Sequence, residues 1–518
     1  MKKPYLFLAI RSLTPLCLCA SVLLCLNLAT HGIADERPNI LFIFTDDQSS
    51  RTISSYPESY EWSHTPNIDR LADSGIRFEH AYMGTWCMPA RATMLTGLQQ
   101  HDIPSVRMSG PYPGAEYDPD ELEFWPKYFR KNGYSTGHIG KWHLTDDTGY
   151  GRDWDYQYAW LRPVPKPGNY REYYVHQTIL ENGRKIGPVD AYATDNYTDR
   201  AIEFIKGDHR KPDQPWYLWL CYTAVHGPWI PADRHLDEYE GVEIPQPADL
   251  YPPRPGTPEY ASQRADFKPD ENGVPHYAGH YGVDQQTGDT LYNGTRRYHQ
   301  SVISIDENVG RLMRTLKSAG QLENTLVVYA SDQGHAWGQH GFLQKLAPYA
   351  ANIRVPFIVS MPGTVASGQV CTSPIGGIDL VPTFFKFAGM EAPWEFQGRD
   401  LTPLLKRPQR HWDHPVFLTF TARSYRPDTG TIPTIDQVPN GIPWYGFVIK
   451  DRFKFIQSWI EDEIPELYHI DNDPHELNNL ALLPQYRHIV EKQHSLLKAE
   501  LKRTNARFLD SLPEMRGF

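Results

Sequence analysis

Polar residues follow three stretches of the chain that are expected to form buried strands. The stretches, each with the polar residues that follow it in the sequence, are 39–45 (NILFIFT) with Asp46-Asp47, 216–222 (WYLWLCY) with His226, and 325–330 (TLVVYA) with Asp332-Gln333. Because ligands of open α/β sheets bind at the carboxyl ends of strands, these groups can converge on one site. Three carboxylates and an amide oxygen suit Ca²⁺ or Mg²⁺, and without a cation the carboxylates would repel one another. One Asp alone is better explained as a turn or helix cap, but together the groups indicate a metal site.

A cysteine at the start of a predicted helix is the second candidate for chemistry. Cys87 opens the run Cys87-Met88-Pro89-Ala90-Arg91, and Pro89 predicts a short helix that ends before Gly97. Helix N-termini attract anions, and the guanidinium of Arg91 can form two hydrogen bonds with an oxyanion. A single cysteine is more often a small buried apolar residue, so this run alone does not identify a nucleophile.

The elements that must position these residues alternate between short apolar runs and helical patterns. This alternation predicts an α/β fold with a parallel sheet and crossover helices. A further strand is expected at 356–360, and helices are expected at 65–71, 89–95, 295–318 and 379–387. The stretches 160–190 and 231–290 are rich in Pro, Gly, Tyr and His and have little periodicity. We expect them to be loops that line a cleft.

The pattern of the sequence changes near Arg410. Residues 447–456 alternate as a hairpin strand does, and 485–507 have the pattern of an amphipathic helix. We interpret this region as a small α+β subdomain that packs against the rest. The predicted organisation is a signal peptide (1–34), a catalytic α/β domain (35–410) and a C-terminal α+β subdomain (411–518).

The composition excludes several classes of protein. The 518 residues are 40% hydrophobic and 13% aromatic, which is too apolar for a disordered chain. Lys and Arg total 51 against 62 Asp and Glu, and the net charge of −11 argues against a general nucleic-acid-binding protein. The length allows one large domain with a smaller one.

The N-terminus has the pattern of a secretory signal peptide. Three cations precede an apolar run at 13–29, and small residues near Ala34 offer a cleavage site. The apolar core is shorter than a spanning helix needs, so an uncleaved anchor is less favoured and no membrane span is expected after cleavage. We therefore expect a secreted or periplasmic protein. Cleavage would leave Cys87, Cys221 and Cys371, and whether the last two are free or paired stays open.

Several short motifs resemble the signatures of the sulfatase family, whose fold is alkaline-phosphatase-like. Cys87-Met88-Pro89-Ala90-Arg91 is similar to the family's Cys-x-Pro-x-Arg signature, and Gly140-Lys141-Trp142-His143-Leu144 is similar to its second signature. Further matches, in the order of the family, are Pro38-Asn39-Ile40 with Asp46-Asp47, Arg354-Val355-Pro356, Asp379-Leu380-Val381-Pro382-Thr383, and one C-terminal signature made of Glu466-Leu467-Tyr468 with 473–480 (DPHELNNL). One such motif would be weak evidence, but six in the right order are strong. The resemblance implies a central, mostly parallel sheet flanked by helices, with a smaller α+β C-terminal subdomain.

The resemblance also implies a modified nucleophile and a metal ion. A maturation enzyme would oxidise Cys87 to Cα-formylglycine, whose hydrated aldehyde attacks sulfur through one hydroxyl and expels sulfate by deprotonation of the other. One Ca²⁺ would be held by Asp46, Asp47, Asp332 and Gln333 beside the modified Cys87. Gln333 departs from the family, which more often has Asn or His there, although its amide oxygen is a suitable donor.

The remaining roles implied by the resemblance concern the nucleophile, the sulfate and the leaving group. Arg91 would stabilise the hydrated aldehyde, and Lys141 and His143 would bind the nucleophile and sulfate oxygens. His226 would protonate the leaving alcohol or bind the sulfate. Lys345 has the position of the family's second sulfate-binding lysine.

Three further histidines are candidate substrate contacts: His101, His335 and His340. The last two lie in the run SDQGHAWGQHG, which resembles polysaccharide- and iduronate-type sulfatases. Sugar rings stack on Trp and Tyr, so an exported enzyme with aromatic-rich insertions suits a sulfated carbohydrate. The sequence therefore predicts a secreted, calcium-dependent sulfatase of a sulfated glycan.

Two other functions fit parts of the same pattern. A phosphonate or phosphate monoester hydrolase is one, because related enzymes share the Cys-x-Pro-x-Arg motif. The other is a glycan-binding protein without activity, whose Cys87 is never modified. The complete set of charged residues at the expected site argues against this second alternative.

Overall fold

The computed structural model describes, apart from the first residue, residues 37–108, 115–162, 171–277 and 290–515. The predicted signal peptide lies outside the described residues. The chain from Arg37 onward forms one compact unit, and the boundary predicted near residue 410 stays a prediction. No helix in the described part of the chain is both long and apolar enough to cross a membrane.

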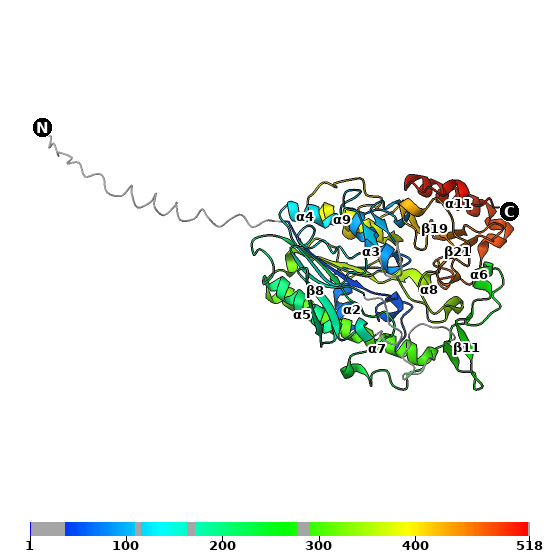
Figure 1. Cartoon of the computed structure of the whole chain (residues 1–518), viewed down its shortest axis with the longest axis horizontal. Coiled ribbons are helices and arrows are strands. Elements are labelled where there is room, and N and C mark those ends of the chain that lie inside the picture. The colour runs from blue at the N-terminus through cyan, green and yellow to red at the C-terminus, as the bar shows by residue number, and fades with distance from the viewer. Residues whose placement is uncertain (2–36, 109–114, 163–170, 278–289, 516–518) are drawn as a thin grey trace. The chain divides into compact units, whose positions relative to one another are not determined.

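A ten-stranded sheet forms the centre of this unit (Figure 1). From edge to edge its strands are β16 (Gln369–Cys371), β2 (Ile76–Phe78), β15 (Phe357–Ser360), β13 (Thr325–Ser331), β1 (Asn39–Thr45), β10 (Trp216–Cys221), β6 (Ser135–Lys141), β7 (Tyr156–Trp160), β8 (Gln177–Glu181) and β9 (Arg184–Val189). The five strands from β13 to β7 are parallel, and antiparallel pairs flank them on both sides. This sheet confirms the predicted α/β fold with a mostly parallel centre.

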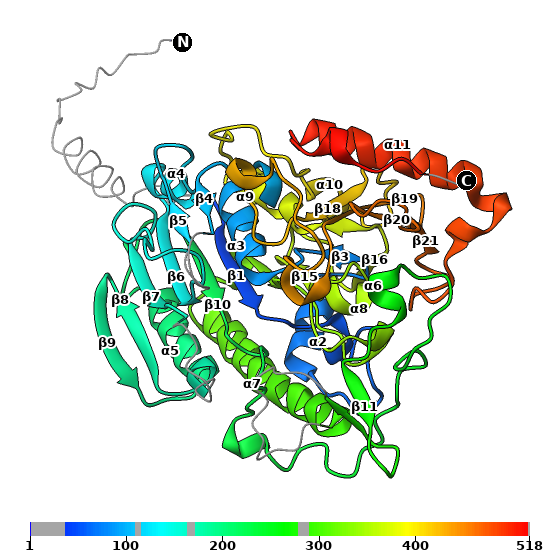
Figure 2. The same cartoon turned by 45° about the vertical axis from the view of Figure 1, so that its right-hand side comes forward.

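Helices cover both faces of the sheet because the side chains of a buried strand point alternately to either side. The helices are α2 (Pro66–Asp73), α3 (Cys87–Thr96), α4 (Pro126–Lys131), α5 (Ala193–Lys206), α7 (Leu291–Ser318) and α9 (Leu380–Phe387). In β1, Ile40, Phe42 and Phe44 pack with residues of α3, α4 and α9. Leu41 and Ile43 pack with residues of α2, α5 and α7. Figure 2 shows the two groups of helices on opposite sides of β1.

Most elements near the predicted site occur where the sequence predicts them. β1 matches its predicted range, and β13 is longer than predicted by one residue. α7 starts four residues earlier than predicted, because the Thr290 side chain caps it by accepting a hydrogen bond from the Asn293 amide at 3.1 Å.

The prediction that 160–190 is a loop is wrong, because it contains β8 and β9. β9 lies at the edge of the sheet and exposes most of its side chains, so its sequence lacks the apolar alternation of a half-buried strand. In 231–290 the described residues include the short helix α6 (Glu259–Ser262) and a small hairpin of β11 (Phe267–Pro269) and β12 (Pro275–Tyr277).

The C-terminal part of the chain forms a second sheet of four antiparallel strands with one long helix. The elements are β18 (Val416–Phe420), β19 (Tyr445–Lys450), β20 (Phe453–Ser458), β21 (Glu466–His469) and α11 (Arg487–Arg503). Residues 447–456, predicted as one strand, instead belong to the facing strands β19 and β20. Asp451 and Arg452 turn the chain with φ of 52° and 68°. Because this turn is only two residues long, the apolar residues on either side look continuous in the sequence.

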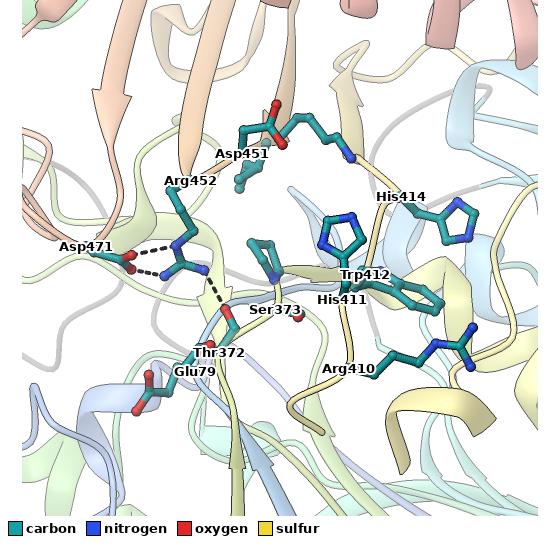
Figure 3. A pocket seen from close by; sticks show the side chains of 13 residues that line it. Glu79, Thr372, Ser373, Arg410, His411, Trp412, His414, Asp451, Arg452 and Asp471 are labelled. Carbon is teal, nitrogen blue, oxygen red and sulfur yellow. Dashed lines mark hydrogen bonds and ion pairs between the residues drawn. The ribbon is translucent and has the colours of Figure 1, made fainter. Parts of the chain in front are cut away.

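The turn between β19 and β20 meets the edge of the large sheet. Arg452 donates a hydrogen bond to the Thr372 carbonyl, directly after β16, at 2.6 Å and pairs with Asp471. A surface pocket of about 560 Å³, lined also by Trp412 and His414, lies beside this contact (Figure 3). Its lining shares no residue with the groups that the sequence predicts to do chemistry.

Candidate active site

Four neighbouring parallel strands end at one edge of the sheet, and each brings polar residues there. The strands and residues are β13 with Asp332-Gln333, β1 with Asp46-Asp47, β10 with His226, and β6 with Lys141 and His143. The register pairs Thr45 with Ser331 and Phe44 with Cys221, so the strands end at similar levels. Cys87 arrives as the first residue of α3. The structure therefore brings together residues that lie far apart in the sequence.

Three buried carboxylates and one thiol form the centre of the site. One side-chain oxygen or sulfur atom from each of Asp46, Asp47, Asp332 and Cys87 lies within 4.8 Å of the others. None of these residues is more than 2% exposed. Asp47 has a φ of 60°, and its amide donates a hydrogen bond to Asp332 Oδ1 at 3.0 Å, which ties the ends of β1 and β13 together.

Three cations face the three carboxylates. The pairs are Lys141 with Asp46, Lys345 with Asp47, and Arg91 with Asp332. Lys345 Nζ lies 2.6 Å from Asp47 Oδ2 and 3.3 Å from Cys87 Sγ. All six side chains are at most 4% exposed, so water screens their charges little.

Burial and neighbouring charges shift the pKa values of this cluster in different directions. Burial alone would raise the pKa of Asp46, but Lys141 and other nearby cations hold it well below its ordinary value. At Asp332, burial and the charge of Asp46 raise the pKa to about 7. Burial raises the pKa of the Cys87 thiol to about 12, so the encoded residue is a thiol at neutral pH and not a thiolate.

Gln333 adds an amide to the carboxylate cluster. Its Nε2 donates hydrogen bonds to Asp47 and to Cys87 Sγ, the latter at 3.1 Å. Its Oε1 is buried without a hydrogen-bond partner among the described residues, which is unfavourable for a polar atom. Turning the amide would direct this oxygen at the carboxylates, which is favourable only with a cation between them. Three carboxylates and one amide oxygen are the donors that Ca²⁺ or Mg²⁺ prefers, so these residues fit the expected metal.

Gly140 allows β6 to end with a lysine at the site. Its φ is 104°, and a Cβ at this position would lie 1.9 Å from the Cys221 carbonyl oxygen. Without a side chain, Gly140 pairs closely with Cys221 of β10. The next residue, Lys141, then extends to Asp46.

Tyr173 contacts two residues of the site, and no motif in the sequence predicted it. Its ring stacks on His226 with centroids 4.2 Å apart, and Lys141 Nζ lies 5.4 Å from the same ring centroid. The Thr223 hydroxyl, two residues beyond β10, donates to the Tyr173 carbonyl. The aromatic richness of 160–190 was the only signal in the sequence that could have pointed to this residue.

Both histidines of the site are buried and uncharged at neutral pH. Burial, together with nearby cations, lowers the pKa of His143 and of His226 well below the ordinary value. His226 Nδ1 lies 2.7 Å from the Gly227 carbonyl, and its Nε2 lies 3.6 Å from Asp47 Oδ2. A neutral ring that donates from Nδ1 leaves Nε2 able to accept a proton. His143 Nε2 lies 3.2 Å from an Arg162 guanidinium nitrogen.

The three histidines expected to contact substrate have other neighbours in the structure. His101 is fully buried, and its ring nitrogens lie 2.8 Å from the Thr419 hydroxyl and 2.9 Å from the Thr504 hydroxyl. These contacts join the short helix Gln100–Asp102 to β18 and to the end of α11, and the role of His101 as a substrate contact stays a prediction. The nearest partners of the other two are Trp229 and Trp337 for His335, and Asp249 and Tyr349 for His340.

All three described cysteines are unpaired and buried. Cys221 lies in β10 and Cys371 ends β16, which answers within the described residues the question that the sequence left open. Cys87 Sγ lies 3.4 Å from Asp46 Oδ1 and 3.3 Å from Lys345 Nζ. An oxygen cage with three cations around a buried residue at a helix start can bind a cation and an oxyanion side by side.

Comparisons with known proteins agree with this geometry. The family model described as Sulfatase matches residues 38–390, and one described as N-sulphoglucosamine sulphohydrolase, C-terminal, matches residues 338–504. An N-acetylglucosamine-6-O-sulfatase of Bacteroides thetaiotaomicron is 28% identical over 527 residues, which cover 92% of this chain and 88% of that protein. An arylsulfatase of Clostridium perfringens is 23% identical and covers 93% of this chain and 98% of its own.

Solved structures extend the similarity to three dimensions. A protein in complex with its substrate D-glucosamine-2-N,6-O-disulfate matches with a TM-score of 0.74 and 25% identity, over 90% of this chain and 98% of that one. The phosphonate monoester hydrolase of Agrobacterium radiobacter matches with a TM-score of 0.64 and 20% identity, over 90% of this chain and 96% of that one. The second similarity shows a shared fold only.

Proposed function

The chain belongs to the sulfatase family and is a sulfuric ester hydrolase, and we propose that it is a calcium-dependent enzyme that desulfates a carbohydrate through a formylglycine made from Cys87. One observation carries this proposal. Three buried carboxylates and the Gln333 amide surround Cys87, and three cations lie among them. Such a site favours a bound cation next to an oxyanion.

Two groups that the chain does not encode would supply part of the chemistry. The hydrated aldehyde made from Cys87 by a maturation enzyme would offer two hydroxyls on one carbon, one as nucleophile and one for product release. Bound Ca²⁺ would offset the negative charge of the sulfate. Asp46, Asp47, Asp332 and Gln333 would hold this ion.

The chain's own residues bind, orient and move protons around residue 87. Lys345, already within 3.3 Å of Cys87 Sγ, would hold the nucleophile and a sulfate oxygen with one ammonium group. Arg91 donates to the Lys141 carbonyl at 2.8 Å and pairs with Asp332, so it fixes the end of β6 to the carboxylate cluster. His226 would take up a proton at Nε2 when the anionic substrate arrives and give it to the leaving oxygen.

A sulfated carbohydrate is the substrate class that the similarities favour. The relatives include an N-acetylglucosamine-6-O-sulfatase, and a protein of similar structure has a sulfated glucosamine as its substrate. We therefore expect turnover first on sulfated glucosamine. Sulfate release can be measured on a panel of desalted sulfated mono-, di- and polysaccharides. This measurement would identify the sugar and the position of the sulfate ester on it.

Export is the part of the proposal that rests on the sequence alone. We propose that residues 1–34 are a signal peptide and that the mature enzyme is secreted or periplasmic. N-terminal sequencing of the protein from periplasm and medium tests this. A mature protein that begins at Met1 in the cytoplasm would contradict it.

The decisive experiment compares sulfate and phosphonate monoesters of the same leaving group. We expect kcat/KM to be higher for the sulfate ester. A far higher kcat/KM for the phosphonate ester would refute the sulfatase proposal and favour a phosphonate monoester hydrolase. Peptide mass spectrometry across Cys87 in natively produced protein is the companion measurement. An unmodified thiol at this position would refute the proposed formylglycine. The remaining alternative would then be a glycan-binding protein without activity.

A further inference from the structure

The segment that brings Lys345 to the site is strained and short. It runs from Lys345 to the start of the four-residue helix α8 (Ala350–Ile353). Leu346, directly after the lysine, has a φ of 86°, which is unfavourable for a residue with a branched side chain. A strained backbone persists only where the surrounding structure holds it. The position of Lys345 therefore depends on what holds 345–350, which we call the lysine loop.

The C-terminal part of the chain holds the lysine loop through four hydrogen bonds. Two loop carbonyls accept hydrogen bonds: Leu346 from the Tyr445 hydroxyl at 2.5 Å, and Pro348 from Lys454 Nζ. Two loop groups donate: the Tyr349 hydroxyl to Glu466 Oε2 at 2.9 Å, and the Ala350 amide to Glu476 Oε2 at 2.6 Å. The residues of the sheet that make these contacts come from β19, β20, β21 and the segment after β21. The contacts reach four of the six residues of the loop, including the last one.

Lys454 and Glu476 form the centre of this contact. Lys454 Nζ lies 2.8 Å from Glu476 Oε1, and the two side chains are 0% and 1% exposed. The ammonium also lies 5.0 Å from the ring centroid of Phe447. A buried ion pair adds little net stability, because the lost hydration offsets the attraction between the charges. It does fix geometry, since each charge must keep its few hydrogen bonds.

We propose that Lys454 and Glu476 are positioning residues, which hold the lysine loop so that Lys345 reaches Asp47 and residue 87. The inference rests on the proposed function, in which Lys345 holds the nucleophile and the sulfate. It also gives the motifs 466–468 and 473–480 a task in the reaction. They act on the active site through Lys345.

A double-mutant cycle tests this dependence. The variant Lys454→Met with Glu476→Gln removes both charges at nearly constant volume. With a fluorogenic aryl sulfate, we expect kcat/KM to fall at least about tenfold in the wild-type background and less than about twofold in the Lys345→Ala background. A residue that only supported the fold would lower kcat/KM by the same factor in both backgrounds, and that result would overturn the inference.

Two further variants keep the test interpretable. Glu500→Gln with Arg503→Met removes the charges of another ion pair, on α11 in the same part of the chain, and we expect kcat/KM to stay within about twofold. Tyr445→Phe removes only the hydroxyl that donates to Leu346, so it should fold even if the first variant does not. It should lower kcat/KM about threefold, again only when Lys345 is present.

Hydrogen exchange separates this inference from the proposed function. Amides of 345–353 should exchange faster in Tyr445→Phe and in Lys454→Met/Glu476→Gln than in the unaltered chain, whatever reaction the enzyme catalyses. Unchanged exchange there, or unchanged kcat/KM in both variants, would overturn the positioning role. A matured chain without turnover of any sulfate ester would defeat the proposed function instead, and the exchange measurement would still decide whether Lys454 and Glu476 hold the lysine loop.

Discussion

Six buried charged side chains meet around Cys87, three acids and three bases. Pairs of charges removed from water seldom add net stability, because their lost hydration offsets their attraction. Their arrangement suits a site that exchanges partners when a cation and an anionic ester bind. Lys345, for example, contacts both Asp47 and Cys87 Sγ and can shift between a carboxylate and a substrate oxygen.

Replacement of Cys87 tests the nucleophile. Cys87→Ala should leave the chain folded, with a loss of about 1–2 kcal/mol in the free energy of unfolding, because it removes one small buried group. It should lower kcat on sulfate esters at least about a thousandfold. Cys371→Ala is the matched control, since this thiol is equally buried at the end of β16, and it should keep kcat. Turnover retained in Cys87→Ala would refute the assignment.

The pH dependence of stability tests the carboxylate cluster. Without metal, the pKa of Asp332 is raised from 3.8 to about 7, so the folded chain binds its proton more tightly than the unfolded chain. The free energy of unfolding should therefore fall as pH rises from about 4 to about 7. Melting temperatures in chelator across this range measure the slope, and bound Ca²⁺ should flatten it.

Asp332→Asn serves as the control for that slope because an amide does not ionise. Its melting temperature in chelator should fall less between pH 4 and pH 7 than that of the unaltered chain. Equal slopes for the two chains would show that Asp332 does not titrate in this range.

The residues at strand ends could be predicted from the sequence, and those held by distant contacts could not. Asp46 and Asp332 follow apolar runs, and motif similarity added Lys141 and Lys345. Tyr173 reaches His226 from a stretch with no period, so only the folded chain reveals it. His101 follows the signature closely in sequence, yet its ring turns toward Thr504 at the end of α11.

At the scale of elements, the apolar runs located the central strands within a residue or two. A fully buried parallel strand such as β1 has an unbroken apolar sequence, which is a strong signal. β6 (STGHIGK) is equally buried but built of small and polar residues, so no apolar run indicates it. β9 escapes prediction for the opposite reason, because it is largely exposed at the sheet edge.

Gly140 shows how one element depends on a missing side chain. Gly140→Ala should cost about 3 kcal/mol or more of unfolding free energy, since the new Cβ would meet the Cys221 carbonyl and the φ of 104° is strained. It should also lower kcat by displacing Lys141. Denaturant unfolding and initial rates measure the two effects.

Gly137→Ala in the same strand is the matched control. Its Cβ would meet only the side chains of Phe204 and Leu218, at 2.9 and 3.0 Å, which can shift. We expect a loss of about 1–2 kcal/mol and little change in kcat. If both variants lost stability and kcat equally, the carbonyl contact at Gly140 would not be the cause.

At the scale of the whole molecule, the C-terminal sheet shares a hydrophobic core with the segments around Cys87. Residues of the C-terminal sheet belong to the same buried cluster as residues around the signature cysteine. Members from the two sides are Phe417, Phe447 and Tyr468 with Tyr82, Trp86, Cys87 and Tyr349. The C-terminal part therefore completes the site's surroundings and does not merely follow it in sequence.

A chain that ends at residue 410 should not fold. Truncation would expose the apolar residues that now face the small sheet, so we expect aggregation and no cooperative unfolding transition. Circular dichroism and gel filtration check this, and limited proteolysis of the full chain should give no stable fragment near 37–410. A monodisperse truncated chain with a sharp transition would contradict the shared core.

The complete burial of Cys87 has a consequence for how active molecules are made. In the folded chain its side chain is 0% exposed and every residue of α3 around it is buried, so a maturation enzyme that must bind this segment has no access to it. If Cys87 is oxidised as proposed, oxidation and folding compete, and oxidation must come first. Each molecule would then become either active or permanently inactive during or soon after its synthesis. The active fraction of a preparation would depend on the ratio of the rate of Cys87 oxidation to the rate of folding. No later treatment of the native protein would change this fraction.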